Sequence, residues 1–315
     1  MGRGVECAAA QNPDAALTCV FTRRDPEAVR TLTGAPVFRA ADLDARAALF
    51  DVLILCGGSA GELPALTPAL ARRFDVVDSF DTHAHIPEHF ARVDAAARSG
   101  GHVALISGGW DPGLFSLLRL YGDAVLPDGR SDTFWGRGVS QGHSAAVRRI
   151  PGVLDARQYT VPLPDALEAA RRGDAPERSA QQKHRREVYI VAAEGADRAA
   201  IERAVVTMPD YFAGYDTSVS FISAEEMARD HAALPHGGAV LRTGRTGLRG
   251  EHRQSAEFRL TLESNPEFTG SVLVALARAV HRLAQRGETG CRTVFDVAPA
   301  DLSPLSGEEL RRRFL

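Results

Sequence analysis

Apolar runs and amphipathic segments alternate along the first part of the chain. The apolar or β-branched runs predict strands at Ala16–Thr22, Asp51–Cys56, Asp75–Phe80 and His102–Ser107. The second run is apolar over most of its length, as in a strand buried on both faces. Helices opened by proline are expected between these strands, at Pro64–Phe74 and Pro87–Ser99. Strands separated by such helices are typical of βαβ units, which predicts an α/β fold with a parallel sheet.

Each predicted strand is followed by glycine or by charged residues. Arg23-Arg24 follow the first strand, Gly57-Gly58-Ser59 the second, Asp81 the third, and Gly108–Gly113, which includes Asp111, the fourth. In open parallel sheets, ligands bind beyond the carboxyl ends of the strands. We therefore expect the ligand site of this domain at these positions.

The pattern changes after about Leu117, where apolar and polar positions alternate more often. This alternation predicts strands at Ala156–Val161, Glu187–Ala192, Thr217–Ser223, Ala239–Thr243 and Ser255–Leu262, with helices near Asp165–Arg172 and Asp197–Thr207. Such a mixture is typical of an α+β domain with a largely antiparallel or mixed sheet. A long apolar helix, Thr269–Arg286, and a strand, Thr293–Val297, are expected to return to the first domain. The predicted domains are 1–117 completed by 265–315, and 118–264, with Arg172–Gln182 as the most linker-like stretch.

Composition excludes several classes of protein. At roughly 150 residues per domain, the 315 residues correspond to about two domains. The formal charge of −3 lacks the basic excess of a nucleic-acid-binding domain. No apolar run approaches the ~18 residues of a membrane helix. The four cysteines have no C-x-x-C spacing, which favours reduced thiols in a cytoplasmic protein over metal ligands or disulfides.

Lysine occurs once, as Lys183. Without a Gly-Lys-Ser/Thr motif the chain is not a P-loop nucleotidase. A Schiff-base enzyme, or a dehydrogenase with a catalytic lysine, would have to use Lys183 itself. It lies in the charged stretch Gln-Gln-Lys-His-Arg-Arg, where the burial that such chemistry needs is not expected.

Two further patterns are interpreted as structural. His83, His85 and His89 are expected to be exposed at a helix entrance, because Pro87 lies between the last two and a zinc site needs three or four converging ligands. Gly138-Val-Ser-Gln-Gly142 has the form of a nucleophile elbow. That motif requires a buried strand before it, and the preceding Thr-Phe-Trp-Gly-Arg-Gly is a poor strand.

Longer motifs carry a specific resemblance. Gly-Gly-Trp-Asp-Pro-Gly-Leu-Phe-Ser occupies 108–116 and Thr-Phe-Trp-Gly-Arg-Gly-Val-Ser-Gln-Gly-His-Ser occupies 133–144, and shorter motifs follow at 148–153, 208–215, 234–238 and 265–269. Together they resemble meso-diaminopimelate dehydrogenases, in register over essentially the whole chain. The resemblance implies a homodimer in which a Rossmann-like doubly wound parallel sheet binds NADP and a second α+β domain serves substrate binding and dimerisation. It also implies NADP-dependent, reversible oxidative deamination of meso-2,6-diaminopimelate at its D-centre, in cytoplasmic lysine biosynthesis.

The resemblance also assigns site residues, position by position. Cofactor binding is expected at Gly2, Thr22, Arg23, Arg24, Cys56, Gly57, Gly58, Ser59, Ser79, Phe80, Asp81, Gly109, Trp110, Asp111, Pro112 and Gly113. Substrate binding is expected at Asp81, Asp111, Trp135, Gln141, Gly142, Thr160, Arg186, His236 and Asn265, the last four holding the L-amino-acid end.

Asp81 and Asp111 are the expected catalytic residues. Hydride loss from the D-centre needs a neutral amine, so a nearby group must first take a proton, and the chain offers carboxylates rather than a usable lysine. His143 is a possible helper, and the residues do not distinguish the aspartate that acts as base from the one that anchors the ammonium. Arg23 and Arg24 suit the 2′-phosphate of NADP, since arginine forks around phosphate oxygens.

The amino-terminal end departs from this resemblance. Members of the family open with a strand and a Gly-rich turn, of which only the third glycine is matched here, by Gly2. We therefore expect the natural protein to begin about a dozen residues earlier, the length of a buried strand plus a turn. Two alternatives stay open, namely a broader NADP-dependent D-amino-acid dehydrogenase and a non-catalytic dimeric remnant that has lost cofactor binding.

Overall fold

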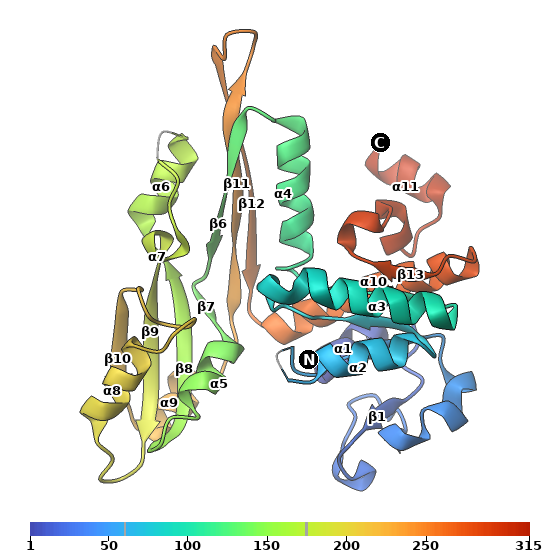
Figure 1. Ribbon diagram of the computed structural model, residues 1–315, viewed down its shortest axis with the longest axis horizontal. Helices are drawn as coiled ribbons and strands as arrows, with labels where there is room; N and C mark the ends of the chain where they lie inside the picture. The colour runs from blue at the N-terminus through green and yellow to red at the C-terminus, as the bar shows by residue number, and fades with distance from the viewer. Residues whose placement is uncertain (60, 174–175) are drawn as a thin grey trace. The chain divides into compact units, whose positions relative to one another are not determined.

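The computed structural model describes residues 1–59, 61–173 and 176–315 (Figure 1). The described residues form two compact units, Met1–Leu117 with Pro266–Leu315, and Leu118–Asn265. Each unit has its own sheets and its own hydrophobic core. Within the described residues, no helix is both long and apolar enough to cross a membrane.

All strand pairs of the first unit are parallel. One sheet has two strands, β1 (Val20–Thr22) and β2 (Val37–Arg39). The other has the order β13-β5-β4-β3 and consists of β3 (Val52–Leu55), β4 (Asp75–Asp78), β5 (Val103–Leu105) and β13 (Gly290–Arg292). The predicted parallel α/β fold is therefore confirmed.

Helices cover both faces of the four-stranded sheet. The helices of this unit are α1 (Gly2–Gln11), α2 (Leu63–Ala71), α3 (Ile86–Gly100), most of α10 (Asn265–Gln285) and α11 (Gly307–Phe314), and α4 (Leu114–Val125) begins in it. One core cluster joins α1 and α10 to Val77 and Leu105, and the other joins α2 and α3 to Val76 and Ile106. Because consecutive strand residues point to opposite faces, the two clusters lie on the two sides of the sheet.

Two expectations for this unit are wrong. Val52, Leu53 and Ile54 are only half-buried, because β3 is an edge strand of its sheet in the described residues. The strand expected at Thr293–Val297 is instead a 3-10 helix at Val294–Asp296, and β13 lies just before it. Thr293 and Asp296 cap this helix reciprocally, and such local hydrogen bonds compete with extended pairing.

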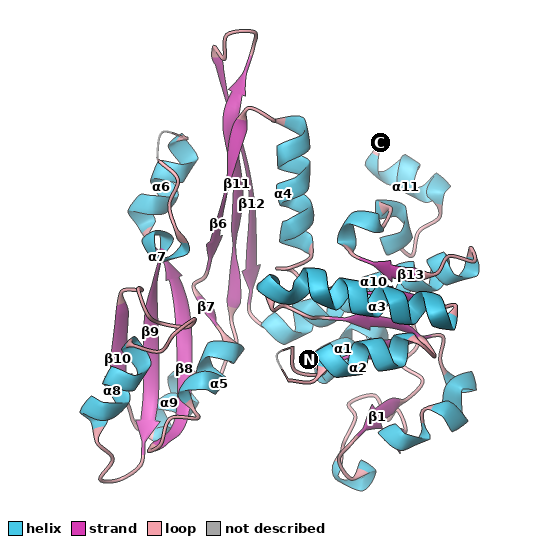
Figure 2. Cartoon of the chain, viewed as in Figure 1, coloured by secondary structure: helices cyan, strands magenta, loops and turns pink. Residues whose placement is uncertain are grey.

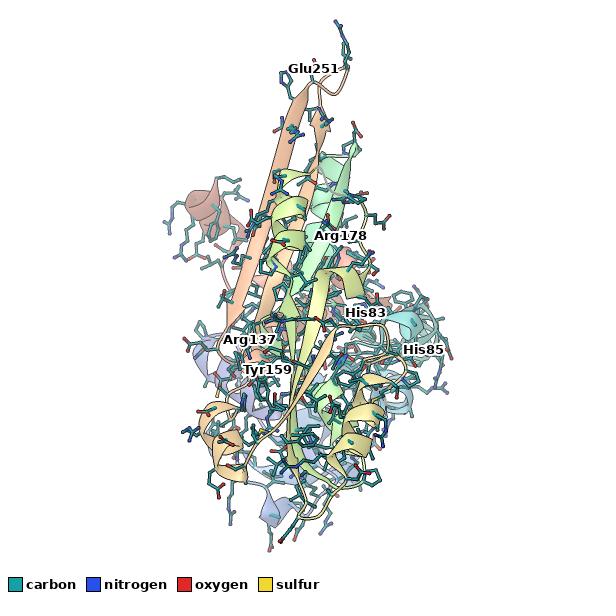
Figure 3. All side chains as sticks on the ribbon, turned by 90° about the vertical axis from the view of Figure 1, so that its left-hand side faces the viewer. His83, His85, Arg137, Tyr159, Arg178 and Glu251 are labelled. Carbon is teal, nitrogen blue, oxygen red and sulfur yellow. The ribbon has the colours of Figure 1, made fainter. Side chains whose placement is uncertain are left out.

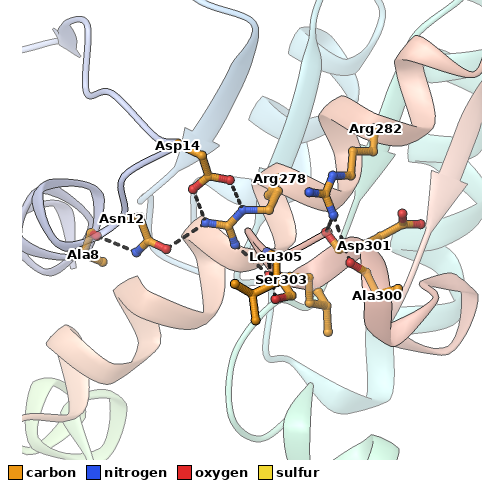
Figure 4. A network of polar contacts seen from close by, with 10 residues as sticks. Ala8, Asn12, Asp14, Arg278, Arg282, Ala300, Asp301, Ser303 and Leu305 are labelled. Atoms are coloured by element: carbon orange, nitrogen blue, oxygen red, sulfur yellow. Dashed lines mark hydrogen bonds and ion pairs between the residues drawn. The ribbon is translucent and has the colours of Figure 1, made fainter. Parts of the chain in front are cut away.

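A buried arginine joins the two ends of the chain within the first unit (Figure 4). The Arg278 guanidinium of α10 donates to both carboxylate oxygens of Asp14, at 2.5 and 2.7 Å, and to Oδ1 of Asn12 at 2.7 Å. It also donates to the carbonyl of Leu302 at 2.7 Å. The Asn12 amide in turn donates to the carbonyl of Ala8, so α1, α10 and the carboxyl-terminal segment are held together.

The second unit contains two sheets (Figure 2). The mixed sheet has the order β10-β9-β8-β7 and consists of β7 (Gly138–Val139), β8 (Val153–Pro162), β9 (His184–Ala192) and β10 (Thr217–Phe221). The antiparallel sheet has the order β12-β11-β6 and consists of β6 (Gly129–Trp135), β11 (His236–Thr246) and β12 (His252–Leu262). The helices are α5 (Gln141–Val147), α6 (Pro164–Arg172), α7 (Ala180–Lys183), α8 (Arg198–Val206) and α9 (Ala224–Asp230).

The predicted α+β character of this unit is confirmed, although two strands, β6 and β7, were not predicted. Thr133-Phe134-Trp135, judged too poor for a strand, is the end of β6, which pairs with β11 over seven residues. Phe134 is buried there against Ala166, Ala170 and Leu241. The expected linker Arg172–Gln182 includes 174–175, which lie outside the described residues, and ends in α7.

Candidate active site

The carboxyl ends of β1 and β3 bring together arginine and backbone N–H groups. Arg23 and Arg24 directly follow β1, and the N–H of Arg24 donates to Oγ1 of Thr22 at 3.2 Å. Arg23 forms an ion pair with Glu62, whose other carboxylate oxygen accepts from the N–H of Gly58 at 2.9 Å. The Arg23 hydrogen bond, with help from Gly58, lowers the pKa of Glu62. An anion is thus held by Arg23 and the glycine turn, which is the donor set a phosphate group uses.

The segment after β4 is fastened to its neighbours on both sides. Oγ of Ser59 accepts from the N–H of Asp81 at 2.8 Å, so the turn after β3 is tied to the turn after β4. The Ser79 hydroxyl lies 3.3 Å from Sδ of Met1, the residue that precedes α1. The amino terminus of α1, with Gly2, therefore lies at the carboxyl end of β4, where a helix dipole favours anions.

Asp111 is carried by a tight loop between β5 and α4. The N–H groups of Leu114 and Phe115 donate to the carbonyls of Gly109 and Trp110 at 3.0 and 2.7 Å. Gly113 has φ +125°, and a Cβ there would lie 1.9 Å from the Gly109 carbonyl oxygen, so only glycine fits. Asp111 is half-buried, whereas Asp81 is exposed. The two aspartates follow neighbouring parallel strands, as the sequence predicts.

Of the three histidines expected to be exposed, two are exposed and one is buried. His83 and His85 are exposed on a 3-10 helix before α3 (Figure 3). His89 is only 3% exposed, and its Nε2 lies 2.8 Å from the carboxylate of Asp78. Burial of His89 follows from its place on the face of α3 that packs against the sheet. No metal-binding cluster of histidine, cysteine and carboxylate side chains occurs among the described residues.

In the second unit, strand register brings Thr160 and Arg186 together. The two residues are paired between β8 and β9, and Arg186 donates through Nη1 to Oγ1 of Thr160. The Arg186 guanidinium lies 4.1 Å from the centre of the Tyr215 ring. Arg186 is 8% exposed, and burial lowers its pKa. No carboxylate among the described residues pairs with Arg186, and its buried Nε has no hydrogen-bond partner there.

His236 and Asn265 lie near the same strands. Gly138 of β7 is paired with Thr160, and a Cβ on Gly138 would lie 2.4 Å from Cγ of His236. The His236 ring therefore packs directly on Gly138, beside the position of Thr160. The N–H of Asn265 donates to the carbonyl of Leu234, two residues before His236, at 3.0 Å. These contacts bring Thr160, Arg186 and His236 close together and place the backbone of Asn265 near that of His236.

Gln141 and Gly142 begin α5, next to a half-buried histidine. Ser140 is the N-cap of α5, and its hydroxyl lies 2.7 Å from Nδ1 of His143. Burial, with a smaller contribution from the Arg186 charge, lowers the pKa of His143 to about 4. His143 is therefore neutral near pH 7. The elbow-like motif does stand between a strand and a helix, but the strand has two residues and Ser140 caps the helix.

Trp135 is positioned by a histidine that the sequence did not single out. The backbone N–H of Trp135 donates to Nε2 of His184 at 2.8 Å, and the two rings stack with centroids 5.2 Å apart. Lys183, the residue before, is not solvated as expected, because its Nζ lies 2.7 Å from Oδ1 of Asp132 and its side chain is only 13% exposed.

Comparison with known proteins decides the family. A model of the diaminopimelic acid dehydrogenase C-terminal domain matches residues 109–264. The chain is 54% identical to the meso-diaminopimelate D-dehydrogenase of Lysinibacillus sphaericus over 315 residues, which cover 100% of this chain and 96% of that one. It belongs to the meso-diaminopimelate D-dehydrogenase family. The member from Corynebacterium glutamicum is 46% identical over 313 residues, covering 99% and 95% of the two chains.

Solved structures of the dehydrogenase family have the same fold. The Corynebacterium glutamicum enzyme in complex with DAP matches with a TM-score of 0.93 at 46% identity, covering 100% of this chain and 96% of that chain. An engineered D-amino acid dehydrogenase bound to NADP+ matches with a TM-score of 0.90 at 44% identity, over 100% and 96% of the two chains. The resemblance seen in the sequence and the α/β fold it implies are thereby confirmed, and the protein is an oxidoreductase of this family.

Proposed function

We propose that this chain catalyses the NADP-dependent, reversible oxidative deamination of meso-2,6-diaminopimelate at its D-centre. The products are L-2-amino-6-oxopimelate and ammonia. The observation that carries the proposal is Arg186, a buried guanidinium with no carboxylate partner among the described residues. A buried charge is costly unless it is paired, so the site calls for an anionic ligand. Relatives at 46–54% identity are named for a dicarboxylate substrate that would provide it.

Thr160, Arg186, His236 and Asn265 would hold the L-amino-acid end of that substrate. Arginine can bind a carboxylate through two parallel N–H groups. The Thr160 hydroxyl oxygen already accepts a hydrogen bond from Nη1, at one edge of the Arg186 guanidinium. The Asn265 amide and the His236 imidazole would accept from the neighbouring ammonium group. Trp135, Gln141 and Gly142 would line the substrate pocket towards the D-centre.

NADP fits the strand ends of the first unit. Thr22, Arg23 and Arg24 would hold the 2′-phosphate and ribose, since Arg23 already binds a carboxylate there. The turn Cys56–Ser59, with the start of α1 at Gly2, would lie along the pyrophosphate, and the Gly58 N–H already donates to an anion. Ser79–Asp81 and Gly109–Gly113 would border the nicotinamide end. NADP supplies the hydride acceptor when it is bound.

Asp81 and Asp111 would carry the proton transfers. One carboxylate takes a proton from the D-centre ammonium, which leaves a neutral amine whose carbon can lose hydride. Water then adds to the resulting iminium carbon, while the protonated carboxyl group gives its proton to the amine nitrogen and takes one from the water. The carbon–nitrogen bond then breaks, ammonia leaves, and the hydroxyl proton passes to solvent as the carbonyl forms. The other carboxylate holds the ammonium in place before reaction. His143, neutral near pH 7 because burial lowers its pKa to about 4, contributes no charge to this exchange.

Stereochemistry is the direct test of this proposal. The chain is expected to form NADPH from meso-diaminopimelate and none from L,L-diaminopimelate, because only the meso compound offers a D-centre while its L-end is held. Simple D-amino acids are the control, since the engineered relative is named a D-amino acid dehydrogenase. Equal turnover of simple D-amino acids would favour the broader specificity, and the lack of saturable NADPH binding would favour a non-catalytic remnant.

Cofactor choice provides a second prediction. Replacing Arg23 and Arg24 together by Ala is expected to weaken NADP binding tenfold or more while affecting NAD little. A charge-assisted hydrogen bond contributes about 1.5–3 kcal/mol, and only NADP has the 2′-phosphate to receive it. The dissociation constants of both cofactors measured by titration check the result. An equal loss of affinity for NADP and NAD would mean that the two arginines bind a part of the cofactor other than the 2′-phosphate.

We also infer a homodimer that works in the cytoplasm in lysine biosynthesis. The support for a dimer is β12, whose residues from His252 to Arg259 are all exposed, although they include the apolar Ala256 and Phe258. An edge strand of this length normally needs cover. The four free cysteines are compatible with a reducing compartment.

A further inference from the structure

Asp78, the last residue of β4, is fully buried and accepts hydrogen bonds at both carboxylate oxygens. Oδ1 accepts from the backbone N–H groups of Phe80 and Ser107, at 3.0 and 2.9 Å. Oδ2 lies 2.8 Å from Oγ1 of Thr67 and 2.8 Å from Nε2 of His89. One oxygen thus binds backbone and the other binds side chains of α2 and α3.

The backbone side of Asp78 joins the two segments that carry the aspartates of the candidate site. Phe80 directly precedes Asp81, and Ser107 begins the segment that leads to Asp111. The Asp78 carbonyl also accepts from the N–H of Gly108 at 2.8 Å. Asp78 is therefore bonded to both strand-end segments at once, while the Thr67 and His89 side fixes the carboxylate to the helices.

The segment after β5 is held in an unfavourable conformation. Ser107 has φ +58°, a left-handed conformation that residues other than glycine rarely adopt. Its hydroxyl is buried and has no hydrogen-bond partner among the described residues. Such a conformation persists only where the surrounding structure imposes it. Residues in strained conformations of this kind cluster at functional sites. Here Asp78 holds the backbone at this residue, because its Oδ1 accepts from the Ser107 N–H and its carbonyl accepts from the Gly108 N–H.

We propose that Asp78 is a positioning residue for the deamination, which fixes the spacing of the Asp81 and Asp111 segments through its bonds to Phe80 and Ser107. The inference rests on the proposed roles of Asp81 and Asp111. This role differs from a general role in stability because the two carboxylate oxygens bind different groups. Loss of the hydrogen bonds from the Phe80 and Ser107 N–H groups releases the two segments, whereas loss of the bonds to Thr67 and His89 does not.

The test compares Asp78→Ala, Asp78→Asn and the matched control Thr67→Val. Asp78→Ala removes the acceptor for both N–H groups, whereas the amide oxygen of Asp78→Asn can still accept from both. Thr67→Val removes one bond on the helix side of the same carboxylate and nearly keeps the side-chain volume. Asp78→Ser, whose hydroxyl can accept from one N–H, replaces Asp78→Ala if that variant does not fold.

The expected result is a split between kcat and stability, with rates normalised to the NADPH sites that bind. Since misplacement of about 1 Å can cost a hundredfold, Asp78→Ala is expected to lower kcat for meso-diaminopimelate about ten- to a hundredfold. Asp78→Asn should stay within about threefold of the unchanged protein, as should Thr67→Val despite a lowered Tm. Equal kcat losses in Asp78→Ala and Thr67→Val, or no rescue by Asp78→Asn, would overturn the proposal.

Hydrogen exchange separates this inference from the proposed function. The Phe80 and Ser107 amides are expected to exchange faster in Asp78→Ala than in Asp78→Asn or Thr67→Val. If the exchange follows this pattern but kcat does not, the positioning role is wrong. If Asp81→Asn and Asp111→Asn themselves leave turnover unchanged, the proposed site is wrong, whatever the exchange shows.

Discussion

Replacing Arg186 by Met is expected to raise the KM for meso-diaminopimelate about a hundredfold or more. The variant loses two charge-assisted hydrogen bonds to the substrate carboxylate. At about 1.5–3 kcal/mol each, their combined free energy is large enough for such a rise in KM. Binding of NADPH should be unchanged, because Arg186 belongs to the second unit and the proposed cofactor residues belong to the first. Steady-state kinetics with meso-diaminopimelate and a separate NADPH titration check both statements.

Arg185→Met is the matched control for this variant. Arg185 precedes Arg186 on β9, but its side chain is 49% exposed and pairs with Glu187, so its loss should change KM little. Removal of the Arg186 charge is also expected to raise the pKa of His143, which that charge helps to lower. A similar KM for both variants would contradict the placement of Arg186 at the substrate carboxylate. An unchanged His143 pKa by NMR would contradict only the electrostatic effect of Arg186 on that histidine.

Asp111→Asn is expected to lower kcat by about a hundredfold or more with little change in NADPH binding. Proton transfer by a positioned side chain contributes about 10²–10⁴-fold, and an amide cannot accept the proton. We assign the base to Asp111 rather than to Asp81 because its loop is locked by the Gly109–Gly113 contact and its side chain is half-buried. The measurement is kcat for meso-diaminopimelate across pH.

Asp81→Asn serves as the counterpart of that variant. Asp81 is exposed, so we expect it to anchor the ammonium, and its replacement should raise KM more than it lowers kcat. A larger loss of kcat in Asp81→Asn than in Asp111→Asn would reverse the two roles. Unchanged kinetics in both variants would remove the aspartates from the reaction altogether.

The parts of the site that lie at strand ends could be predicted from the sequence. A parallel strand and the polar residues after it form a local pattern, so Gly58, Asp81 and Asp111 could be placed at the carboxyl ends of strands without knowledge of tertiary contacts. Arg23 also follows a parallel strand, but β1 belongs to the separate two-stranded sheet. The pairing of Thr160 with Arg186 could not be placed in this way. It depends on the register between β8 and β9, and a shift of one residue would turn Arg186 to the other face.

Buried polar side chains were the main source of error. His89 was expected to be exposed at a helix entrance, yet it is buried beside Asp78. Lys183 was expected to be solvated in a charged stretch, yet it is half-buried and pairs with Asp132. A partner of this kind leaves no local signal, because burial is decided by which helix or strand packs over the residue. The resemblance to a family named the substrate residues, but the sequence alone did not reveal Asp78.

The contacts of Arg278 constrain the order in which the protein can be completed during synthesis. Its partners Asn12 and Asp14 leave the ribosome early, whereas α10 and Leu302 emerge only after the whole of Leu118–Asn265. The second unit is continuous in sequence and can fold while translation proceeds. In the first unit, Val5 and Ala8 lack their native apolar partners until Leu273 and Val280 have been synthesised, and apolar surface exposed in this way promotes aggregation.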